Sequence, residues 1–434
     1  MSVCRNNPSR WGNDMAQASF LGDMLTTLFE RRRAQTPITD ARSLMQMCEA
    51  LLASEGEVSG MSLATAILDR YGTLNAHEKL EFFQFINSDL ELDATLLQTL
   101  TAQYIETTSL ADYIAVVQAS EPRRQELLRR INQSPGATAA LVSMRADLLG
   151  FLPDHPDLRR TDLDFVHLLR SWFNRGFLVL REISWDTPAS VLEKIVAYEA
   201  VHAINSWDEL RLRLYPQDRR CYAYFHPTMP DEPLIFVEVA LTKSVPRSIH
   251  KLLTQDRVQR ETSETTVAVF YSISNCQAGL HGISFGNLLI KQVVGELSQA
   301  LPQLDTFVTL SPIPGFNRWC KATLADDEIT EENVQPLAAH YLLNERSKRG
   351  GPLDPVARFH LGNGAQIHAV HSDADRTEKG QAQSSGAMVN YLYDLSKIEK
   401  NHEAFVRGDG FSASKAVLTA ANAAKPLLTT KNTQ

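Results

Sequence analysis

Apolar residues recur with helical spacing over the first part of the chain, from about residue 15 to residue 172. Leu141, Met144, Leu148, Phe151 and Leu152 fall on one face of a helix, because each lies close to a whole number of turns from the first. The same spacing predicts helices near residues 17–34, 40–54, 60–71, 76–88, 94–105, 108–118 and 122–134. Residues 1–172 are therefore predicted to form an all-helical domain.

After residue 173 the pattern changes to short runs of β-branched and aromatic residues that alternate with helical stretches. The predicted strands are 176–185, 221–226, 234–242, 266–274, 305–311 and 365–370. Between the first two strands Thr187 is placed to cap a helix, and Pro188 suits its first turn. Residues 173–434 are predicted to form an α/β domain, so the expected fold is a helical domain followed by an α/β domain.

The composition narrows the classes of function. A length of 434 residues fits two domains, and a net charge of -8 leaves no overall basic field, so no nucleic-acid partner is expected. No run of about 18 apolar residues is present, so no membrane span is expected. The five cysteines are far apart and form no CxxC pair, which argues against a zinc site and a disulfide framework.

The stretch 266–300 contains a strand, a loop with Gly279, Gly282 and Gly286, and a helix predicted from about Ser284. Glycines let backbone N–H groups approach an anion, and the N-terminus of a helix adds partial positive charge. The loop is therefore a candidate cradle for a pyrophosphate, although glycine can also serve simply to bend the chain. No Gly-Lys-Ser/Thr closes the loop, and no acidic residue is placed for a dinucleotide ribose, so ATP and NAD are disfavoured.

Two further residues are candidates for chemistry, each with a structural alternative. Ser311 ends a predicted strand ahead of two prolines, where it could equally be a turn serine that bonds its own backbone. His360 lies between Phe359 and Leu361, an environment that is more often a core position than a catalytic one.

Six blocks of sequence, spread over about 200 residues, resemble blocks that occur in the same order in a known protein family. They are YEAVHAINSW at 198–207, RRCYAYFHPTMPDEPLIFVEVALT at 219–242, FYSISNCQAGLHGI at 270–283, LSPIPGF at 310–316, DPVARFHLGNGA at 354–365 and MVNYLY at 388–393. The chain resembles the malonyl-CoA decarboxylase family, and residues 277–282 resemble the acyl-CoA loop of the GNAT superfamily. The resemblance implies a GNAT-like catalytic α/β domain with a mixed central sheet at 173–434 and a role in fatty acid metabolism.

The resemblance also assigns roles to residues. It implies that Ser311 and His360 are catalytic and that Tyr393 lines the active site, although Tyr393 could equally be a core aromatic. The residues expected to contact the substrate and its CoA are Ser274, Gln277, Ala278, Gly279, Leu280, His281, Gly282 and Ser284. Animal members have glutamate at the position of Ser284, so no carboxylate role can be transferred there. The CoA 3′-phosphate could meet any of Lys243, Arg247, Lys291 and Arg318.

Decarboxylation of malonyl-CoA leaves a thioester enolate that must be stabilised and protonated. No metal and no separate cofactor are expected, because CoA is part of the substrate. We expect His360 to polarise the thioester carbonyl or to deliver the proton, since the pKa of histidine usually lies near working pH. We expect Ser311 and His360 to form a hydrogen-bonded pair at the substrate carboxylate and enolate. Ser311 would orient the malonyl group, although the two roles could be reversed.

Two other functions stay open at this point: an acyltransferase on the same scaffold, which would need a second substrate, and a non-catalytic regulator that binds malonyl-CoA. The resemblance implies that residues 1–172 mediate formation of a homo-oligomer, a tetramer or dimer. The chain ends at Gln434 without the Ser-Lys-Leu of many animal relatives, so a cytoplasmic location is expected.

Overall fold

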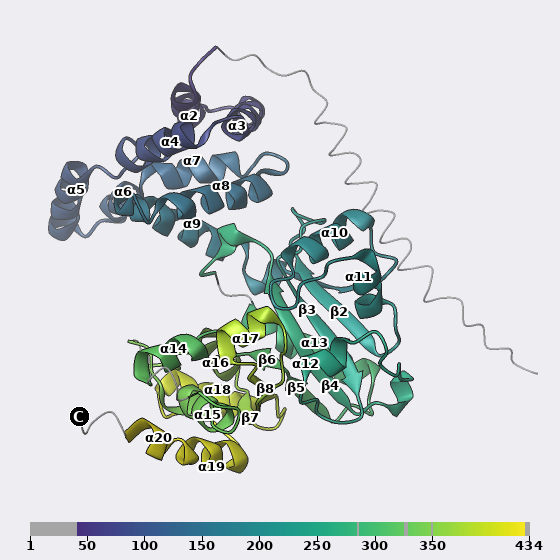
Figure 1. The fold of residues 1–434 in the computed structure, drawn as a ribbon. Coiled ribbons are helices and arrows are strands. Elements are labelled where there is room, and N and C mark those ends of the chain that lie inside the picture. Colours follow the sequence, from purple (N-terminus) through teal and green to yellow (C-terminus); the bar gives the residue numbers. More distant parts are fainter. Residues whose placement is uncertain (1–40, 284–285, 325–328, 349, 430–434) are drawn as a thin grey trace, which may run out of the picture. The chain divides into compact units, whose positions relative to one another are not determined.

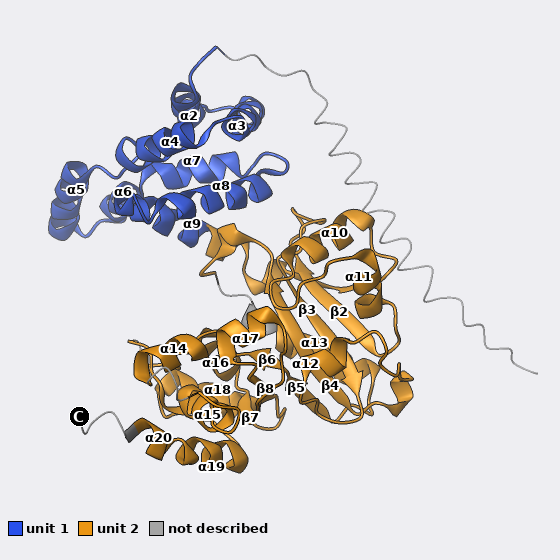
Figure 2. Ribbon diagram, in the orientation of Figure 1, with its two compact units in different colours: residues 1–168 blue, residues 169–434 orange. Residues whose placement is uncertain are grey.

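The computed structural model describes residues 41–283, 286–324, 329–348 and 350–429. The chain separates into two compact units, residues 1–168 and 169–434 (Figures 1 and 2). Within the described residues no helix is long and apolar enough to cross a membrane.

Every element described in the first unit is a helix (Figure 1). The helices are α2 (Leu44–Ala53), α3 (Glu57–Gly72), α4 (Ala76–Ser88), α5 (Ala94–Thr107), α6 (Leu110–Ala119), α7 (Arg123–Ile131), α8 (Ala137–Phe151), the 3-10 turn η1 (Pro156–Leu158) and α9 (Arg159–Trp172). Ser43 and Gln46 form a reciprocal capping box at the start of α2, which satisfies N–H groups that the helix itself cannot bond. The prediction of an all-helical first region is confirmed for these residues, whereas the helix predicted at 17–34 lies outside them.

The second unit is built on one mixed sheet. Its strands are β1 (Val179–Ile183), β2 (Arg219–Phe225), β3 (Ile235–Thr242), β4 (Val267–Asn275), β5 (Thr306–Thr309), β6 (Ser311–Pro312), β7 (Gln366–His371) and β8 (Met388–Leu392). The strand order is β1-β2-β3-β4-β5-β8-β6, and β7 also pairs with β8. Strands β4 and β5 are parallel, and the other neighbours are antiparallel, so the predicted mixed α/β sheet is confirmed.

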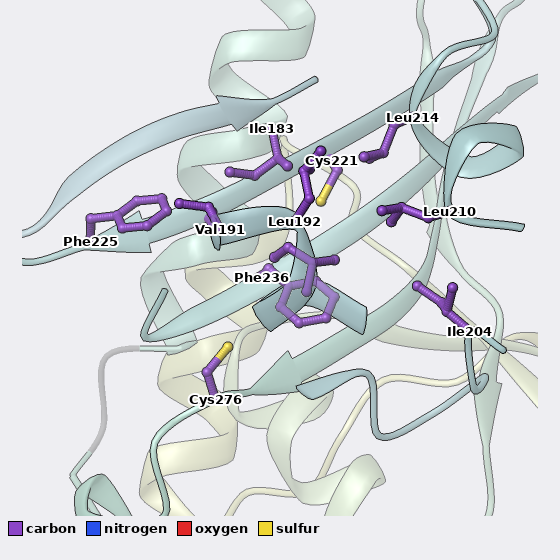
Figure 3. Packing of buried hydrophobic residues seen from close by; sticks show 12 residues of the cluster. Ile183, Val191, Leu192, Ile204, Leu210, Leu214, Cys221, Phe225, Phe236 and Cys276 are labelled. Carbon is purple, nitrogen blue, oxygen red and sulfur yellow. The ribbon is translucent and has the colours of Figure 1, made fainter. Parts of the chain in front are cut away.

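Helices and short 3-10 turns surround this sheet. They are η2 (Arg175–Phe177), α10 (Ala189–Tyr198), α11 (Trp207–Leu214), α12 (Ile249–Leu253), η3 (Thr262–Glu264), η4 (Ala278–Leu280), α13 (Gly286–Ala300), α14 (Phe316–Thr323), α15 (Val334–Asn344), α16 (Pro355–Gly362), α17 (Glu378–Ser384), α18 (Ile398–Arg407), α19 (Lys415–Ala423) and α20 (Lys425–Thr429). Figure 3 shows how the apolar faces of α10 and α11 pack against β1, β2 and β3 through Ile183, Leu192, Leu210, Cys221 and Phe236. Burial of these side chains anchors α10 and α11 to one face of the sheet.

Some local predictions are wrong. Thr187 does not cap α10: the N-cap is Pro188, without a side-chain bond, and the Thr187 hydroxyl instead accepts from the Ser184 N–H at 3.0 Å. The strand predicted at 305–311 is interrupted at Leu310, and its two parts meet β8 separately. Strand β8 was not predicted, because its five residues carry no alternation of polar and apolar side chains and the first four of them are all buried.

Two features of β4 shape the functional end of the sheet. Glu238 of β3 lies opposite Ser272 and Val239 lies opposite Phe270, so Tyr271 forms a bulge in β4. Pairing between β4 and β5 ends at Phe270, although β4 continues to Asn275. The last five residues of β4 therefore extend beyond the end of β5.

Candidate active site

Ser311 lies where the chain leaves β5 and begins the short strand β6. Its side chain is buried, and its backbone pairs with Val389 of β8. The Ser311 hydroxyl donates to the Thr309 hydroxyl at 2.9 Å, and the same Thr309 oxygen accepts from the Tyr391 backbone N–H at 3.1 Å. The serine is therefore held by its neighbours and does not form the self-bonded turn considered as its alternative.

His360 lies in the last turn of α16. Asp354 starts this helix by accepting the N–H groups of Val356 and Ala357, both at 2.9 Å. After the helix, Gly364 turns the chain with φ +85°, and a Cβ there would collide with the carbonyl of Ile398, so only glycine fits. The sequence around His360 thus fixes both ends of the short helix that presents the imidazole.

The imidazole of His360 bridges Ser311 and Tyr393. Its Nε2 lies 3.2 Å from the Ser311 hydroxyl oxygen, and its Nδ1 lies 2.8 Å from the Tyr393 hydroxyl oxygen. The ring stacks on Tyr391 with centroids 4.5 Å apart. Three residues that are well separated in sequence therefore form one buried hydrogen-bonded line.

Burial lowers the pKa of His360 from 6.5 to about 3. The imidazole is neutral at pH 7, so the expectation that its pKa lies near working pH is wrong for this structure. The single proton of Ser311 goes to Thr309, so Nε2 of His360 must carry the proton that it shares with Ser311. Nδ1 then accepts from Tyr393, and the hydrogen bonds select one tautomer.

The glycine loop follows β4 at the same end of the sheet as Ser311, because β4 and β5 are parallel. Gly282 has φ +79° and open space around the position of a Cβ, so its backbone conformation alone favours glycine. The Gln277 amide donates to the Pro233 carbonyl at 3.1 Å and holds the start of the loop. Ser284 lies outside the described residues.

Ser274 has a different position from the one expected of a direct substrate contact. Its hydroxyl accepts from the Ala200 N–H at 3.1 Å and lies 3.4 Å from a carboxylate oxygen of Glu199. Glu199 also accepts from the Ser272 hydroxyl at 2.7 Å. The Ser274 side chain thus joins β4 to the segment after α10.

Comparison with known proteins identifies the family. The family model of the malonyl-CoA decarboxylase C-terminal domain matches residues 176–332 and 325–431, and that of the malonyl-CoA decarboxylase N-terminal domain matches residues 91–173. The chain belongs to the malonyl-CoA decarboxylase family.

Named relatives and solved structures agree with this family. The mitochondrial malonyl-CoA decarboxylase of Anser anser anser is 35% identical over 350 residues, which cover 69% of each chain, and that of Mus musculus is 33% identical over 69% of this chain and 71% of its own. The crystal structure of malonyl-CoA decarboxylase from Rhodopseudomonas palustris has a TM-score of 0.82 and 47% identity, and covers 87% of this chain and 98% of its own. The crystal structure of malonyl-CoA decarboxylase from Agrobacterium vitis has a TM-score of 0.83 and 48% identity, and covers 87% of this chain and 99% of its own.

Several residues that lie around the candidate active site were not predicted from the sequence. Thr309 and Tyr391 touch Ser311 and His360, but an isolated threonine or tyrosine in an apolar strand carries no signal. Asn363 is 1% exposed and therefore buried. Its side-chain amide opposes the burial that raises the pKa of Tyr393, so it lies near that hydroxyl. The sequence feature that could have identified Asn363 is its position within the block 354–365.

The described residues contain no group of three or more histidine, cysteine or acidic side chains that could hold a metal ion. Among the candidates for the CoA 3′-phosphate, Lys243 follows β3 at the end of the sheet away from the glycine loop, and its ammonium lies 3.2 Å from Glu264. Lys243 is therefore a poor candidate.

Proposed function

We propose that the protein converts malonyl-CoA to acetyl-CoA and CO2 at the line formed by Ser311, His360 and Tyr393. The observation that carries this proposal is the continuous set of hydrogen bonds from Thr309 through Ser311 and His360 to Tyr393 in a buried site. A buried site strengthens the interaction of a donor with charge that develops in the transition state. Membership of the malonyl-CoA decarboxylase family supports the choice of reaction.

The neutral state of His360 suggests its role. As the bond to the carboxylate breaks, its electron pair moves into the thioester, and CO2 leaves. The Nε2–H of His360, which Ser311 accepts in this structure, would turn to the thioester oxygen as negative charge develops there. Tyr393 would keep the proton on that nitrogen by donating to Nδ1. Ser311 would orient the malonyl carboxylate. A water molecule would then give its proton to the enolate carbon, which forms acetyl-CoA and leaves hydroxide. CoA takes part only as a portion of the substrate.

We also propose that the pyrophosphate of CoA lies on residues 277–283 and that the pantetheine follows β4. The last residues of β4 extend beyond the end of β5, which leaves backbone groups on that edge of the strand for a ligand. Because the Ser274 hydroxyl is engaged with Glu199 and Ala200, this residue would contribute through its backbone. The parallel arrangement directs such a ligand towards Ser311.

The decisive experiment uses malonyl-CoA alone, with acetyl-CoA followed by mass spectrometry. We expect wild-type protein to form acetyl-CoA and Ser311→Ala or His360→Ala to be slower by at least about 100-fold. His77→Ala changes an exposed histidine of α4 and serves as the matched control. Bound but unreacted malonyl-CoA in the wild type would contradict the proposal and point to a transferase or a regulator.

The helical unit offers a surface for self-association. Neither α5 nor α6 has a buried residue, and α6 exposes Leu110, Tyr113, Ile114 and Val117 by 45 to 73%. We propose that this helix pair packs against a second copy of the chain, because apolar residues grouped on one helix hairpin favour association. We expect Ile114→Glu/Val117→Glu to lower the subunit number in light scattering, whereas Glu106→Lys on the same hairpin should not.

We propose that the protein is located in the cytoplasm. The animal relatives are named as mitochondrial proteins, so localisation of a tagged full-length protein in its source cell would test this expectation directly.

A further inference from the structure

Two adjoining cavities of about 300 and 320 Å³ lie beside the start of β2 and the end of β3. They share Arg219, Thr254 and Arg257 in their walls, and Arg213 lines the first. His250, Lys251 and Arg260 contribute further basic side chains. We call these two cavities together the arginine cavity.

The arginine cavity lies at the end of the sheet away from the candidate active site. Thr242 pairs with Val267 and Ile235 pairs with Asn275, so the two ends of β4 are separated by about 26 Å at 3.3 Å per residue. Arg219 and Thr242 belong to the first of these ends, and the glycine loop follows Asn275 at the other. The cavity is therefore distinct from the proposed CoA site.

Three guanidinium groups in the cavity wall are largely shielded from water. Arg213 donates to Glu238 at 2.9 Å. Arg257 donates to both carboxylate oxygens of Asp218, at 2.5 and 3.0 Å. Arg219 lies 3.7 Å from the same carboxylate and donates to the carbonyls of Asp218 and Leu252.

These contacts leave positive charge in excess. Arg219 and Arg257 share the single carboxylate of Asp218. The exposed Lys251 and the half-buried Arg260 add two more cations against the half-buried Glu209. Burial lowers the pKa of Arg219, and repulsion from Arg257 contributes in the same direction. A bound anion would relieve this repulsion and would meet donors that are already held in place.

We propose that the arginine cavity binds a small phosphate-bearing anion. A phosphoryl group accepts hydrogen bonds from several directions, which suits guanidinium groups presented from β2 and from the loop after α12, whereas a planar carboxylate suits one fork. Each cavity has room for an anion of the size of pyrophosphate but is too small for a whole coenzyme A.

Inorganic pyrophosphate is the probe, titrated into the full chain by calorimetry at constant ionic strength without divalent cations. We expect saturable binding to one site, and Lys251→Gln/Arg260→Gln to weaken it by about tenfold. Lys251 is exposed and Arg260 is half-buried, so their replacement should leave the fold intact. Lys400→Gln, which changes an exposed lysine of α18, is the matched control and should bind as the wild type does.

A second titration in the presence of saturating CoA separates the two sites. Unchanged pyrophosphate affinity supports the arginine cavity as an independent site. Loss of the signal with CoA, equal affinity in the double variant, or no saturable binding by the wild type would each overturn the proposal. Because the readout is binding, its outcome does not depend on whether malonyl-CoA is decarboxylated.

Discussion

The candidate active site and the arginine cavity both bury polar side chains against the same sheet, but they do so by different means. Ser311, His360 and Tyr393 are kept neutral, and each hydrogen bond satisfies a donor with an acceptor. In the arginine cavity the groups are ionised, and Arg219 and Arg257 share one carboxylate. A neutral site of donors can receive the negative charge of a reaction, whereas a site with excess positive charge is suited to hold an anion that does not react.

Removal of the shared carboxylate should give the largest effect on stability. In Asp218→Ala, Arg257 loses both hydrogen bonds to Asp218 and two buried guanidinium groups are left without an anion. We expect the free energy of unfolding to fall by about 3–5 kcal/mol in urea denaturation. Asp409→Ala removes an exposed partner of Arg407 and should cost about 0–1 kcal/mol. Equal losses in the two variants would show that the cavity is not held by its ion pairs.

The neutral histidine should make stability depend on pH. The unfolded chain binds a proton at His360 below about pH 6.5, but the folded protein does so only near pH 3, so this stability is present above pH 6.5 and is lost as the pH falls towards 3. Between pH 7 and pH 5 the loss is about 2 kcal/mol. Urea denaturation at the two pH values should show a smaller loss in His360→Gln; the same loss in both proteins would refute a neutral, buried imidazole.

The smallest of these effects should come from Tyr393, which lies at one end of the hydrogen-bonded line. Tyr393→Phe removes the donor to Nδ1 of His360 but keeps the ring, so we expect kcat to fall by about tenfold with little change in KM. Steady-state kinetics with malonyl-CoA measures the two parameters separately. Tyr215→Phe changes an exposed tyrosine as a control. A rise in KM at constant kcat would assign Tyr393 to substrate binding.

The surroundings of His360 show which features of the candidate site could be predicted from nearby residues in the sequence. The block 354–365 was identified by its resemblance to a family block, whereas the helix that starts at Asp354 and the turn at Gly364 were not predicted. Nothing in that block shows that the ring stacks on Tyr391 or that burial removes its charge. The expected pKa near neutrality was wrong because desolvation depends on residues that come from other parts of the chain.

The sequence by itself determined the helical first region, most strands of the mixed sheet and the blocks that indicate the malonyl-CoA decarboxylase family. These features depend on side-chain periodicity and turn residues within a few positions, so they can be read locally. Only the tertiary structure decided that His360 meets Ser311 through Nε2 and Tyr393 through Nδ1, and that β8 pairs with β5, β6 and β7. Such contacts arise when distant segments are buried together, and burial then also decides which of the polar groups stay neutral and which remain charged.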